Sequence, residues 1–528
     1  MTELLLFIGI VMTACILMQK LTAKLPIPSL LAFLILGMMF GVDGLFKISF
    51  DNYQMSEIIC SVSLIFIMFY GGFGTSFKAA KPVFIRSSLM ATLGVLLTAG
   101  LTGMFVHLVL KLDLLQSLLI GSVIASTDAA SVFGILRSKN LNLKDNTASL
   151  LEVESGSNDP MSYMLTIVLC TLMSGQQVSV FTLLLKQILF GLALGYISGK
   201  CTAKILKVFH IAEQGKTIFM LAVVIMTYAI SSLIGGNGYL SVYIAGILLG
   251  NTRLPDKRSL VHFFDTLTSM AQMMIFFLLG LLVTPSQLPE VFVPALMITI
   301  FLTFVSRPAA VFMTLFPFGT TFSQVGLVSW SGLRGVASIV FAITVVLSNV
   351  ALDYNIFNLV FCIVLLSISI QGTLLPKVAQ VLNMIDDSND VLKTFNDYQD
   401  ESNVRFVKVH IDEFHPWINL KLSEIRLPQD FLVVLILRNE TELVPNGSTI
   451  IEKGDLMVIA AQEFNDRQNL SMQEIIIDKN HMWVNQTIKD IALDKGNLVI
   501  MIKRKDDTII PLGKTKILED DTLVIARH

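Results

Sequence analysis

The sequence predicts a polytopic α-helical membrane protein with a smaller cytoplasmic α+β domain at its C-terminal end. Of the 528 residues, 54% are hydrophobic and 15% are charged, against roughly 25% charged in ordinary globular chains. The mean hydropathy is +0.71. A soluble protein of this composition could not cover its surface with polar groups. Polar composition begins only after Asp386, and the region beyond residue 403 contains an internal repeat.

These shifts in composition divide the chain into four parts. Residues 1–385 form a transmembrane domain, and residues 386–402 form an acidic linker without apolar periodicity. Residues 403–462 and 463–528 form two lobes of soluble composition. The net charge of -2 argues against a nucleic-acid partner. All five cysteines lie in apolar stretches, so no disulfide framework is expected. The expected surroundings are a lipid bilayer and the cytoplasm.

A membrane-spanning helix needs about 20 mostly apolar residues. We identify thirteen such stretches, of which the ninth is short: 3–19, 27–45, 57–77, 83–109, 114–136, 148–173, 178–204, 216–234, 239–250, 262–284, 287–306, 322–348 and 354–382. The first stretch lacks a basic segment and a small-residue cleavage site, so we interpret it as a retained helix and not a signal peptide.

Lysine and arginine residues alternate between the two sets of connections. The odd-numbered connections are all basic, Arg307 being the basic residue of the eleventh, whereas the even-numbered ones hold only Lys47 and Lys111. Basic connections stay on the cytoplasmic side of a cell membrane. The pattern therefore predicts an N-terminus outside the cell and a cytoplasmic C-terminal domain.

Two of the stretches are interrupted by polar or glycine-rich residues. Segment 114–136 contains Ser126, Thr127 and Asp128, and segment 322–348 contains Arg334 between two glycines. The two segments lie seven spans apart, so an inverted repeat of spans 1–6 and 8–13 would make them equivalent. Broken helices at matching positions of two halves indicate the substrate site of a transporter.

The sixth stretch, 148–173, has a polar face. Glu154 and Asn158 are four residues apart, as are Ser155 and Asp159, and this spacing puts each pair on one side of a helix. Pro160 removes a backbone donor directly after Asp159. The pattern predicts one carboxylate at a weakened turn and another a turn earlier.

Arg334 is the only arginine within an expected span, and an unpaired buried charge is very costly. We therefore predict an ion pair between Arg334 and Glu154, which could serve structure alone. Thr127 could bond to the backbone or a neighbour, as in ordinary membrane helices. Asp128 could cap a helix. A structural explanation is weakest for Asp159 beside Asn158.

Three motifs are similar to those of a known family. The runs STDAASVF (126–133), ESGSNDP (154–160) and GLRGVASIVFA (332–342) resemble the monovalent cation/proton antiporters, specifically the NhaP-like branch with thirteen spans. The resemblance implies a secondary transporter and not an enzyme. It implies that Asp159, beside Asn158, carries the exchanged ion or proton. It also implies that Thr127 and Ser155 help to ligate the cation.

The same resemblance implies a structural ion pair of Glu154 with Arg334, an Asp128 that orients the broken helix, a homodimer, and no cofactor. One residue departs from the family pattern. Tyr70, in the run Phe69-Tyr70-Gly71-Gly72, stands where relatives often have an acidic residue. The transported cation therefore stays open between K⁺ and Na⁺, with K⁺ favoured because similar regulatory lobes recur in potassium systems.

A mechanism follows from the chemistry of a carboxylate shielded from water. Such a group can hold a proton, or lose it and bind a hard cation, and alternating access then gives obligatory exchange. The alternative is a proton- or sodium-coupled carrier of a small organic solute. That carrier would need an apolar or aromatic lining, whereas the polar residues here are rich in oxygen.

The C-terminal region contains two copies of one pattern. Residues 408–460 align with residues 474–526 without a gap, with 19 identities. Each copy predicts a strand, a short helix and further strands around a tight turn. The copies resemble the C-terminal lobe of RCK (TrkA-type) regulatory domains, and no dinucleotide-binding glycine motif accompanies them. They form either a regulatory domain or an assembly module without a ligand.

Relatives of this lobe suggest a cytoplasmic signal, and cyclic di-AMP is the regulator that we hypothesise. Its phosphates could be bound by four basic residues, which could equally be solvated charges: Arg438, Lys503, Arg504 and Lys505.

Overall fold

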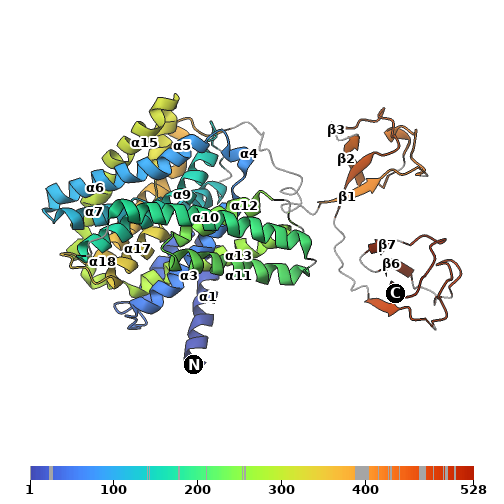
Figure 1. The fold of residues 1–528 in the computed structure, drawn as a ribbon, viewed down its shortest axis with the longest axis horizontal. Coiled ribbons are helices and arrows are strands. Elements are labelled where there is room, and N and C mark those ends of the chain that lie inside the picture. The colour runs from blue at the N-terminus through green and yellow to red at the C-terminus, as the bar shows by residue number, and fades with distance from the viewer. Residues whose placement is uncertain are drawn as a thin grey trace. The chain divides into compact units, whose positions relative to one another are not determined.

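A computed structural model gives the fold of the chain (Figure 1). It describes residues 2–22, 28–138, 141, 143–175, 179–209, 211–252, 254, 257–386, 404–413, 415–425, 427–428, 431–438, 441–462, 471–479, 481–491, 493, 498–504, 507–509 and 511–527. The chain divides into two compact units, Met1–Asn389 and Asp390–His528. The expected linker lies outside the described residues, apart from Asp386.

The first unit is a bundle of helices. They are α1 (Thr2–Thr22), α2 (Ser29–Phe40), α3 (Tyr53–Gly74), α4 (Phe77–Ala80), α5 (Phe84–Leu89), η1 (Met90–Gly94), α6 (Val95–Leu110), α7 (Leu114–Val123), α8 (Ala129–Ser138), α9 (Thr147–Met173), α10 (Val180–Val208), α11 (Glu213–Leu233), α12 (Gly238–Gly250), α13 (Lys257–Leu282), η2 (Pro285–Gln287), α14 (Leu288–Phe301), η3 (Leu302–Ser306), α15 (Arg307–Leu315), η4 (Phe316–Phe318), α16 (Phe322–Trp330), α17 (Val336–Leu347), α18 (Ile356–Leu366), η5 (Ser367–Gly372) and α19 (Thr373–Val381). Within the described residues, seven helices are long and apolar enough to cross a membrane, and shorter apolar helices accompany them.

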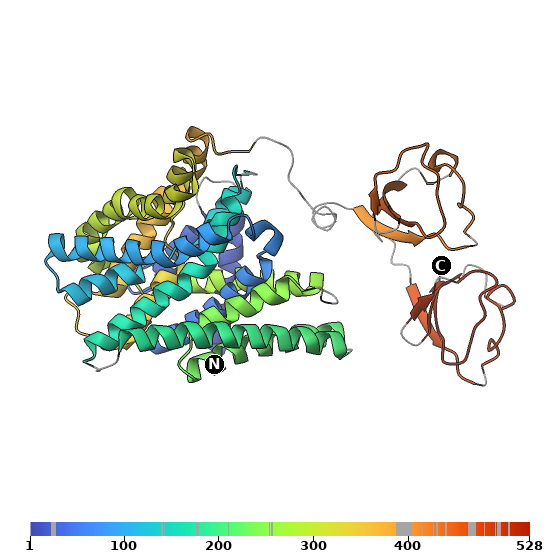
Figure 2. The same ribbon diagram turned by 45° about the horizontal axis from the view of Figure 1, so that its top comes forward.

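The middle of the bundle is made by α17 and α18. Phe341, Phe357 and Phe361 are fully buried there. The long helix α10 runs along one side of the bundle (Figure 2), and its Phe181 is 73% exposed. Exposed apolar side chains on outer helices suit contact with lipid. The first unit thus has the burial pattern of a membrane bundle.

Close helix contact shapes one wall of the bundle. Gly246 of α12 faces α3, and a Cβ atom there would lie 2.5 Å from the Phe69 carbonyl oxygen. Only glycine permits this approach. The contact holds α12 directly beside α3, and α3 lines the cavity described below.

The second unit contains two four-stranded antiparallel sheets of β1 (Val404–His410), β2 (Phe431–Arg438), β3 (Thr441–Leu443), β4 (Leu456–Gln462), β5 (Ser471–Ile476), β6 (Leu498–Arg504), β7 (Asp507–Ile509) and β8 (Thr522–Arg527). Their strand orders match, β1-β4-β2-β3 and β5-β8-β6-β7. Asn419 and Asn485 take the same left-handed conformation, with φ of 63° and 66°. The expected short helix is one 3-10 turn, Leu422–Glu424, in the first copy, and the described part of the second copy has none.

Each sheet carries the same ion pair between a partly exposed arginine and a buried aspartate. Arg438 donates from Nε and Nη2 to Asp455, both at 2.8 Å, and Arg504 donates likewise to Asp521 at 2.7 Å. Burial alone would raise the pKa of Asp455. The hydrogen bonds from Arg438 and the Glu452 N–H, with the Arg438 charge, outweigh burial and lower it. The pKa of Asp521 is lowered in the same way by Arg504 and the Leu518 N–H.

This pairing bears on the basic residues expected to bind phosphates. Arg438 and Arg504 are occupied by buried aspartates, and Lys503 pairs with Glu474 at 2.5 Å. Lys505 lies outside the described residues. Each arginine therefore pairs with a buried aspartate of its own copy and is not a simple solvated charge, while its role in binding phosphates stays a prediction.

Candidate functional site

Two broken helices meet inside the first unit. The first break, residues 124–128, separates α7 from α8, and the second, residues 331–335, separates α16 from α17. The Asp128 N–H donates to the Leu333 carbonyl oxygen at 2.9 Å. Arg334 Nη1 donates to the carbonyl oxygens of Ala125 and Ser126 at 2.7 and 2.6 Å. The guanidinium thus binds carbonyls of the break directly after the C-terminal end of α7, where the helix dipole is negative.

Asp128 begins the second half of its broken helix. Its Oδ1 accepts from the Ser131 N–H at 3.1 Å and its Oδ2 from the Ser131 hydroxyl at 2.6 Å. This is the geometry of an N-cap. Gly335 lies against the same carboxylate, since a Cβ there would be 2.0 Å from Asp128 Oδ2. The two breaks therefore fit together through a glycine and a capping aspartate.

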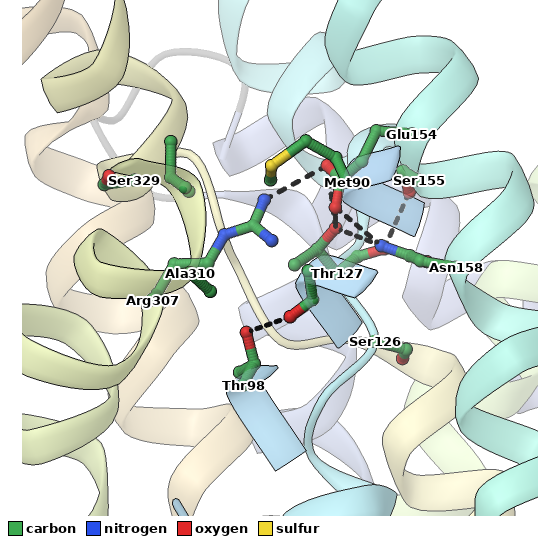
Figure 3. Close-up of polar contacts among 12 residues, drawn as sticks. Met90, Thr98, Ser126, Thr127, Glu154, Ser155, Asn158, Arg307, Ala310 and Ser329 are labelled. Atoms are coloured by element: carbon green, nitrogen blue, oxygen red, sulfur yellow. Dashed lines mark hydrogen bonds and ion pairs between the residues drawn. The ribbon is translucent and has the colours of Figure 1, made fainter. Parts of the chain in front are cut away.

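Glu154 forms its ion pair with Arg307, which corrects the predicted pair with Arg334. Arg307 Nη2 lies 3.1 Å from Glu154 Oε2, and each residue is 1% exposed (Figure 3). Within the described part of the chain, no ion pair joins Glu154 to Arg334. The reason is that the Arg334 side chain is used by the backbone carbonyls of the first break.

The predicted span 287–306 and the charge alternation put Arg307 in the connection that follows this span. In the structure α14, η3 and α15 continue through it, and the apolar segment runs from Pro285 to Phe318. The signal that could have found it is the apolar run on both sides of Arg307. Arg307 therefore leaves the set of basic connections and joins the buried site.

Asn158, Thr127 and Ser155 tie the first break to α9 (Figure 3). Asn158 Nδ2 donates to Thr127 Oγ1 at 2.6 Å and to Glu154 Oε1 at 3.1 Å. The Ser155 hydroxyl donates to the Thr127 carbonyl oxygen at 2.6 Å. Thr127 Oγ1 lies 3.4 Å from both Glu154 oxygens. These bonds fix the position of Thr127 relative to α9.

A cavity of about 420 Å³ lies beside this network. Four of the predicted residues line it, namely Thr127, Asp128, Ser155 and Asp159. Tyr70 of α3 lines it as well. The predicted residues Asn158, Glu154 and Arg334 are not among the lining residues and lie behind its wall.

Asp159 has a free acceptor in this cavity. The side chain lies beside the Ser126 hydroxyl. Its Oδ1 is buried and has no hydrogen-bond partner among the residues that the structure describes. A buried polar atom without a partner is uncommon and calls for an explanation. A proton or a cation bound at this oxygen would supply one.

Helix α13 contributes polar residues that sequence reasoning missed. Asp265, Thr268, Ser269 and Gln272 line the cavity, and Glu152 of α9 completes its acidic lining. The α13 residues recur at the three- and four-residue spacing of one helix face. That spacing was visible within the expected span 262–284. The cavity is thus bounded by four carboxylates, from Asp128, Glu152, Asp159 and Asp265.

Comparison with known proteins agrees with this arrangement. The family described as sodium/hydrogen exchanger, transmembrane, matches residues 8–381. The TrkA-C domain matches residues 406–463 and 472–526. The chain is 37% identical over 382 residues to the K⁺/H⁺ antiporter NhaP of Alkalimonas amylolytica, covering 72% of this chain and 67% of the relative.

A second relative, the K⁺/H⁺ antiporter NhaP2 of Shewanella sp. (strain ANA-3), is 32% identical over 456 residues, which cover 85% of this chain and 79% of the relative. Among solved structures, the sodium proton antiporter MjNhaP1 of Methanocaldococcus jannaschii matches with a TM-score of 0.64 and 25% identity. That match covers 72% of this chain and 99% of the other. The chain is therefore a member of the sodium/hydrogen exchanger family, with a TrkA-C region behind its transmembrane part.

Proposed function

We propose that this protein exchanges a monovalent cation, K⁺ ahead of Na⁺, for protons across the cell membrane. The observation that carries the proposal is the buried, unpartnered Oδ1 of Asp159 in a cavity between two broken helices. An oxygen in this setting can take a proton or contribute to a cation site, and it cannot comfortably do both at once. Exchange follows when the site reorients only while it is occupied.

The neighbouring residues have distinct roles in this scheme. Asp159 carries the ion or proton, and the oxygen atoms of Ser155, Thr127 and Asp128 around the cavity help to hold the cation. Asn158 is a positioning residue, because its amide is directed to Thr127 and Glu154. Glu154 and Arg307 clamp α9 to α15, and Arg334 keeps the first break open.

The preference for K⁺ rests on the relatives and on the lining. The Alkalimonas and Shewanella relatives are named K⁺/H⁺ antiporters, whereas MjNhaP1 is named a sodium proton antiporter. Tyr70 lines the cavity with a phenol in place of a carboxylate, whereas Asp265 adds a carboxylate from α13. Oxygen ligands bind both cations, so cavity size decides between them.

The proposed topology has thirteen spans, with spans 1–6 and 8–13 as inverted repeats. Its support is that α7–α8 and α16–α17, the fifth and twelfth spans, are broken and cross each other. The charge alternation supports an N-terminus outside and a cytoplasmic second unit, even without Arg307. We propose a homodimer in the cell membrane, by analogy with the family.

The second unit is proposed to regulate exchange, with a small cytoplasmic molecule as the signal. Cyclic di-AMP is the candidate. The ion pairs of Arg438 and Arg504 with aspartates weigh against a main role of these two arginines in binding it. Equilibrium binding of cyclic di-AMP to the purified full chain tests the candidate. No binding at millimolar concentration would leave the unit an assembly module.

The decisive experiment is flux in proteoliposomes that contain a pH-sensitive dye. Wild-type protein should move protons when K⁺ is added, less with Na⁺, and not with organic solutes. Asp159→Asn should abolish this flux, because an amide cannot alternate between proton and cation. The matched control Asp51→Asn removes an exposed carboxylate between α2 and α3 and should leave the flux unchanged.

Two outcomes would overturn the proposal. Near-normal cation-dependent proton flux in Asp159→Asn would remove the proposed carrier. Flux driven by an organic solute in the absence of K⁺ and Na⁺ gradients would favour the solute carrier instead.

A further inference from the structure

The cavity around Asp159 is open at one end and closed at the other. At the open end, Gly74 at the end of α3 and Asp265 near the start of α13 are exposed. Its lining ends at Leu64 on α3, Asp159 on α9 and Ala337 on α17. One helical turn further along these helices, none of the residues lines the cavity. The closure therefore lies between Asp159 and the far end of the bundle.

Four aromatic side chains fill that turn. Tyr163 follows Asp159 by four residues on α9, and Phe341 follows Ala337 by four on α17. Tyr239 at the start of α12 packs edge-on against Tyr163, with ring centroids 5.0 Å apart at 85°. Tyr228 of α11 lies 5.0 Å from Tyr239, and Phe341 lies 5.5 Å from Tyr163. We name Tyr163, Tyr228, Tyr239 and Phe341 the aromatic layer.

The aromatic layer connects four helices, and Tyr163 and Tyr228 are partly buried in it. Tyr239 is 2% exposed and Phe341 is 0% exposed. Centroid separations of 4.5–7 Å with tilted or edge-on rings are the favourable arrangement for aromatic pairs. Since each ring comes from a different helix, the layer would break when those helices move apart. Such a contact excludes water and ions and is still reversible.

Polar groups resume on the other side of the layer. On α3, the Ser61 hydroxyl donates to Glu57 Oε1 at 3.1 Å, and both residues precede Leu64, the first α3 residue of the cavity. Tyr239 lies beside Ser61, and Glu57 lies one turn before Ser61 on the same helix. Tyr239 of the aromatic layer therefore borders a polar region that contains a carboxylate.

A hydrogen bond connects the layer to the ion site. Asn237, which is 1% exposed, caps α12 by accepting from the Leu240 N–H at 3.0 Å. Its amide donates to the carbonyl oxygen of Pro160 at 2.9 Å. Pro160 directly follows Asp159, and Tyr239 comes two residues after Asn237. A backbone shift at Asp159 would therefore pull on the end of α12 that carries a ring of the layer.

We propose that the aromatic layer is the gate of the second access path to Asp159, and that this path leads past Ser61 and Glu57. The proposal rests on the proposed exchange function and deepens it, because it names the residues that must part when Asp159 faces the other side of the membrane. Asn237 acts as a positioning residue between the site and the gate.

Labelling of a cysteine from each side of the membrane tests the gate. The reporter is Ala337→Cys, placed in a chain whose five native cysteines are replaced by serine or alanine. A membrane-impermeant maleimide is applied to right-side-out and to inverted vesicles, and the initial labelling rate is measured from each side. The cysteine-replaced chain with Ala337→Cys and an intact aromatic layer, called the background, should be labelled much faster from the side on which the cavity opens.

Removing two rings of the layer should open the slow side. In Tyr163→Ala/Tyr239→Ala, labelling from that side should rise at least about tenfold, which a barrier lower by about 1.4 kcal/mol produces. Tyr163→Phe/Tyr239→Phe keeps the rings and should keep the one-sided labelling. Tyr196→Ala, which removes a 54%-exposed ring from α10, is the control and should also keep it.

Single variants keep the test valid if the double alanine variant does not fold. Tyr239→Ala alone and Phe341→Ala alone should each raise labelling from the slow side, while retained labelling from the open side reports an intact bundle. An unchanged slow-side rate in both, or equal rates from both sides in the background, would overturn the gate.

Flux measured on the same vesicles separates the two proposals. If the cysteine-replaced chain exchanges K⁺ for protons but removal of the rings does not change labelling, the gate alone is wrong. If removal of the rings raises labelling from the slow side, but no cation drives proton flux in the cysteine-replaced chain with its rings intact, the gate stands and the exchange function is wrong.

Discussion

Glu154 joins three parts of the site. It pairs with Arg307 of α15, accepts from Asn158 one turn along α9, and lies near the Thr127 hydroxyl of the first break. Arg307 is as buried as Glu154, and its Nε and Nη1 have no partner within the described residues. Two opposite charges that are this well shielded depend on each other, because either one alone would be left without compensation.

This dependence gives a prediction for stability. Glu154→Gln and Arg307→Met should each lower the free energy of unfolding by about 3–5 kcal/mol, since each leaves one buried charge unpaired. The double variant should recover part of the loss. Thermal unfolding in detergent measures the coupling energy of this cycle.

The control cycle pairs Glu154→Gln with Arg334→Met. Because Arg334 donates to the Ala125 and Ser126 carbonyls, its coupling to Glu154 should be clearly smaller than that of Arg307. A larger coupling with Arg334 would restore the ion pair expected from sequence and contradict the structure.

The ion-pair partner of Glu154 could not be predicted from the sequence. The four-residue spacing of Glu154 and Asn158 follows from helix geometry alone, and their hydrogen bond is present. The choice between two arginines depends on which helix lies opposite α9. That is set by tertiary packing, and local spacing contains no information about it. The position of Asp265 in the cavity could have been predicted, because the sequence places it on one helix face with Gln272.

At the scale of elements, the two breaks are held by complementary shape. Gly335 has no side chain, and Asp128 occupies the space where one would stand. The breaks could be predicted because a polar or glycine-rich tripeptide interrupts an otherwise apolar span. That the two breaks contact each other could be predicted only from the expected inverted repeat. No sequence pattern indicates which distant carbonyl oxygen accepts from a given N–H group.

Gly335→Ala should disrupt this contact. A Cβ atom 2.0 Å from Asp128 Oδ2 forces the cap of α8 to move, and misplacement of a site by about 1 Å can cost roughly 100-fold in rate. We expect K⁺-dependent proton flux in proteoliposomes to fall at least tenfold. Gly100→Ala on α6, where nothing lies within 4 Å, is the matched control. Near-normal flux in Gly335→Ala would show that transport does not depend on close contact between Gly335 and Asp128.

The sheets of the second unit depend on their buried aspartates. The folded pKa of Asp521 is lowered, so its contribution to stability is present above the pKa of the unfolded chain. That contribution is lost as the pH falls through the lowered folded value. Asp521→Asn should therefore destabilise the β5–β8 sheet at neutral pH by about 2 kcal/mol and have little effect at low pH.

Hydrogen exchange of peptides from β6 and β8 in the full chain measures this effect. Glu519→Gln removes an exposed partner of Lys479 and should change little at any pH. Equal effects of the two substitutions, or an effect of Asp521→Asn that grows as the pH falls, would exclude the pH dependence described here.

At the scale of the whole molecule, the chain joins two units that are built on different principles. The first buries ionisable groups in an apolar bundle, and the second repeats one small sheet with the same ion pair in each copy. The cavity around Asp159, the two helix breaks and the Glu154–Arg307 clamp all belong to the first unit. A ligand bound by the second unit can alter exchange only by binding one arrangement of the protein better than another.

Truncation after Asp387 tests this division of labour. Because every residue assigned to the ion site precedes that position, the truncated chain should still exchange K⁺ for protons in proteoliposomes. The pH dependence of its transport rate should differ from that of the full chain, since the proposed regulatory unit is removed.

The full chain with Asp521→Asn serves as the comparison, because it keeps the second unit but weakens one sheet. Loss of all exchange by a truncated chain that still inserts would make the second unit part of the transport machinery. An identical pH profile would remove the regulatory role and leave the second unit with assembly alone.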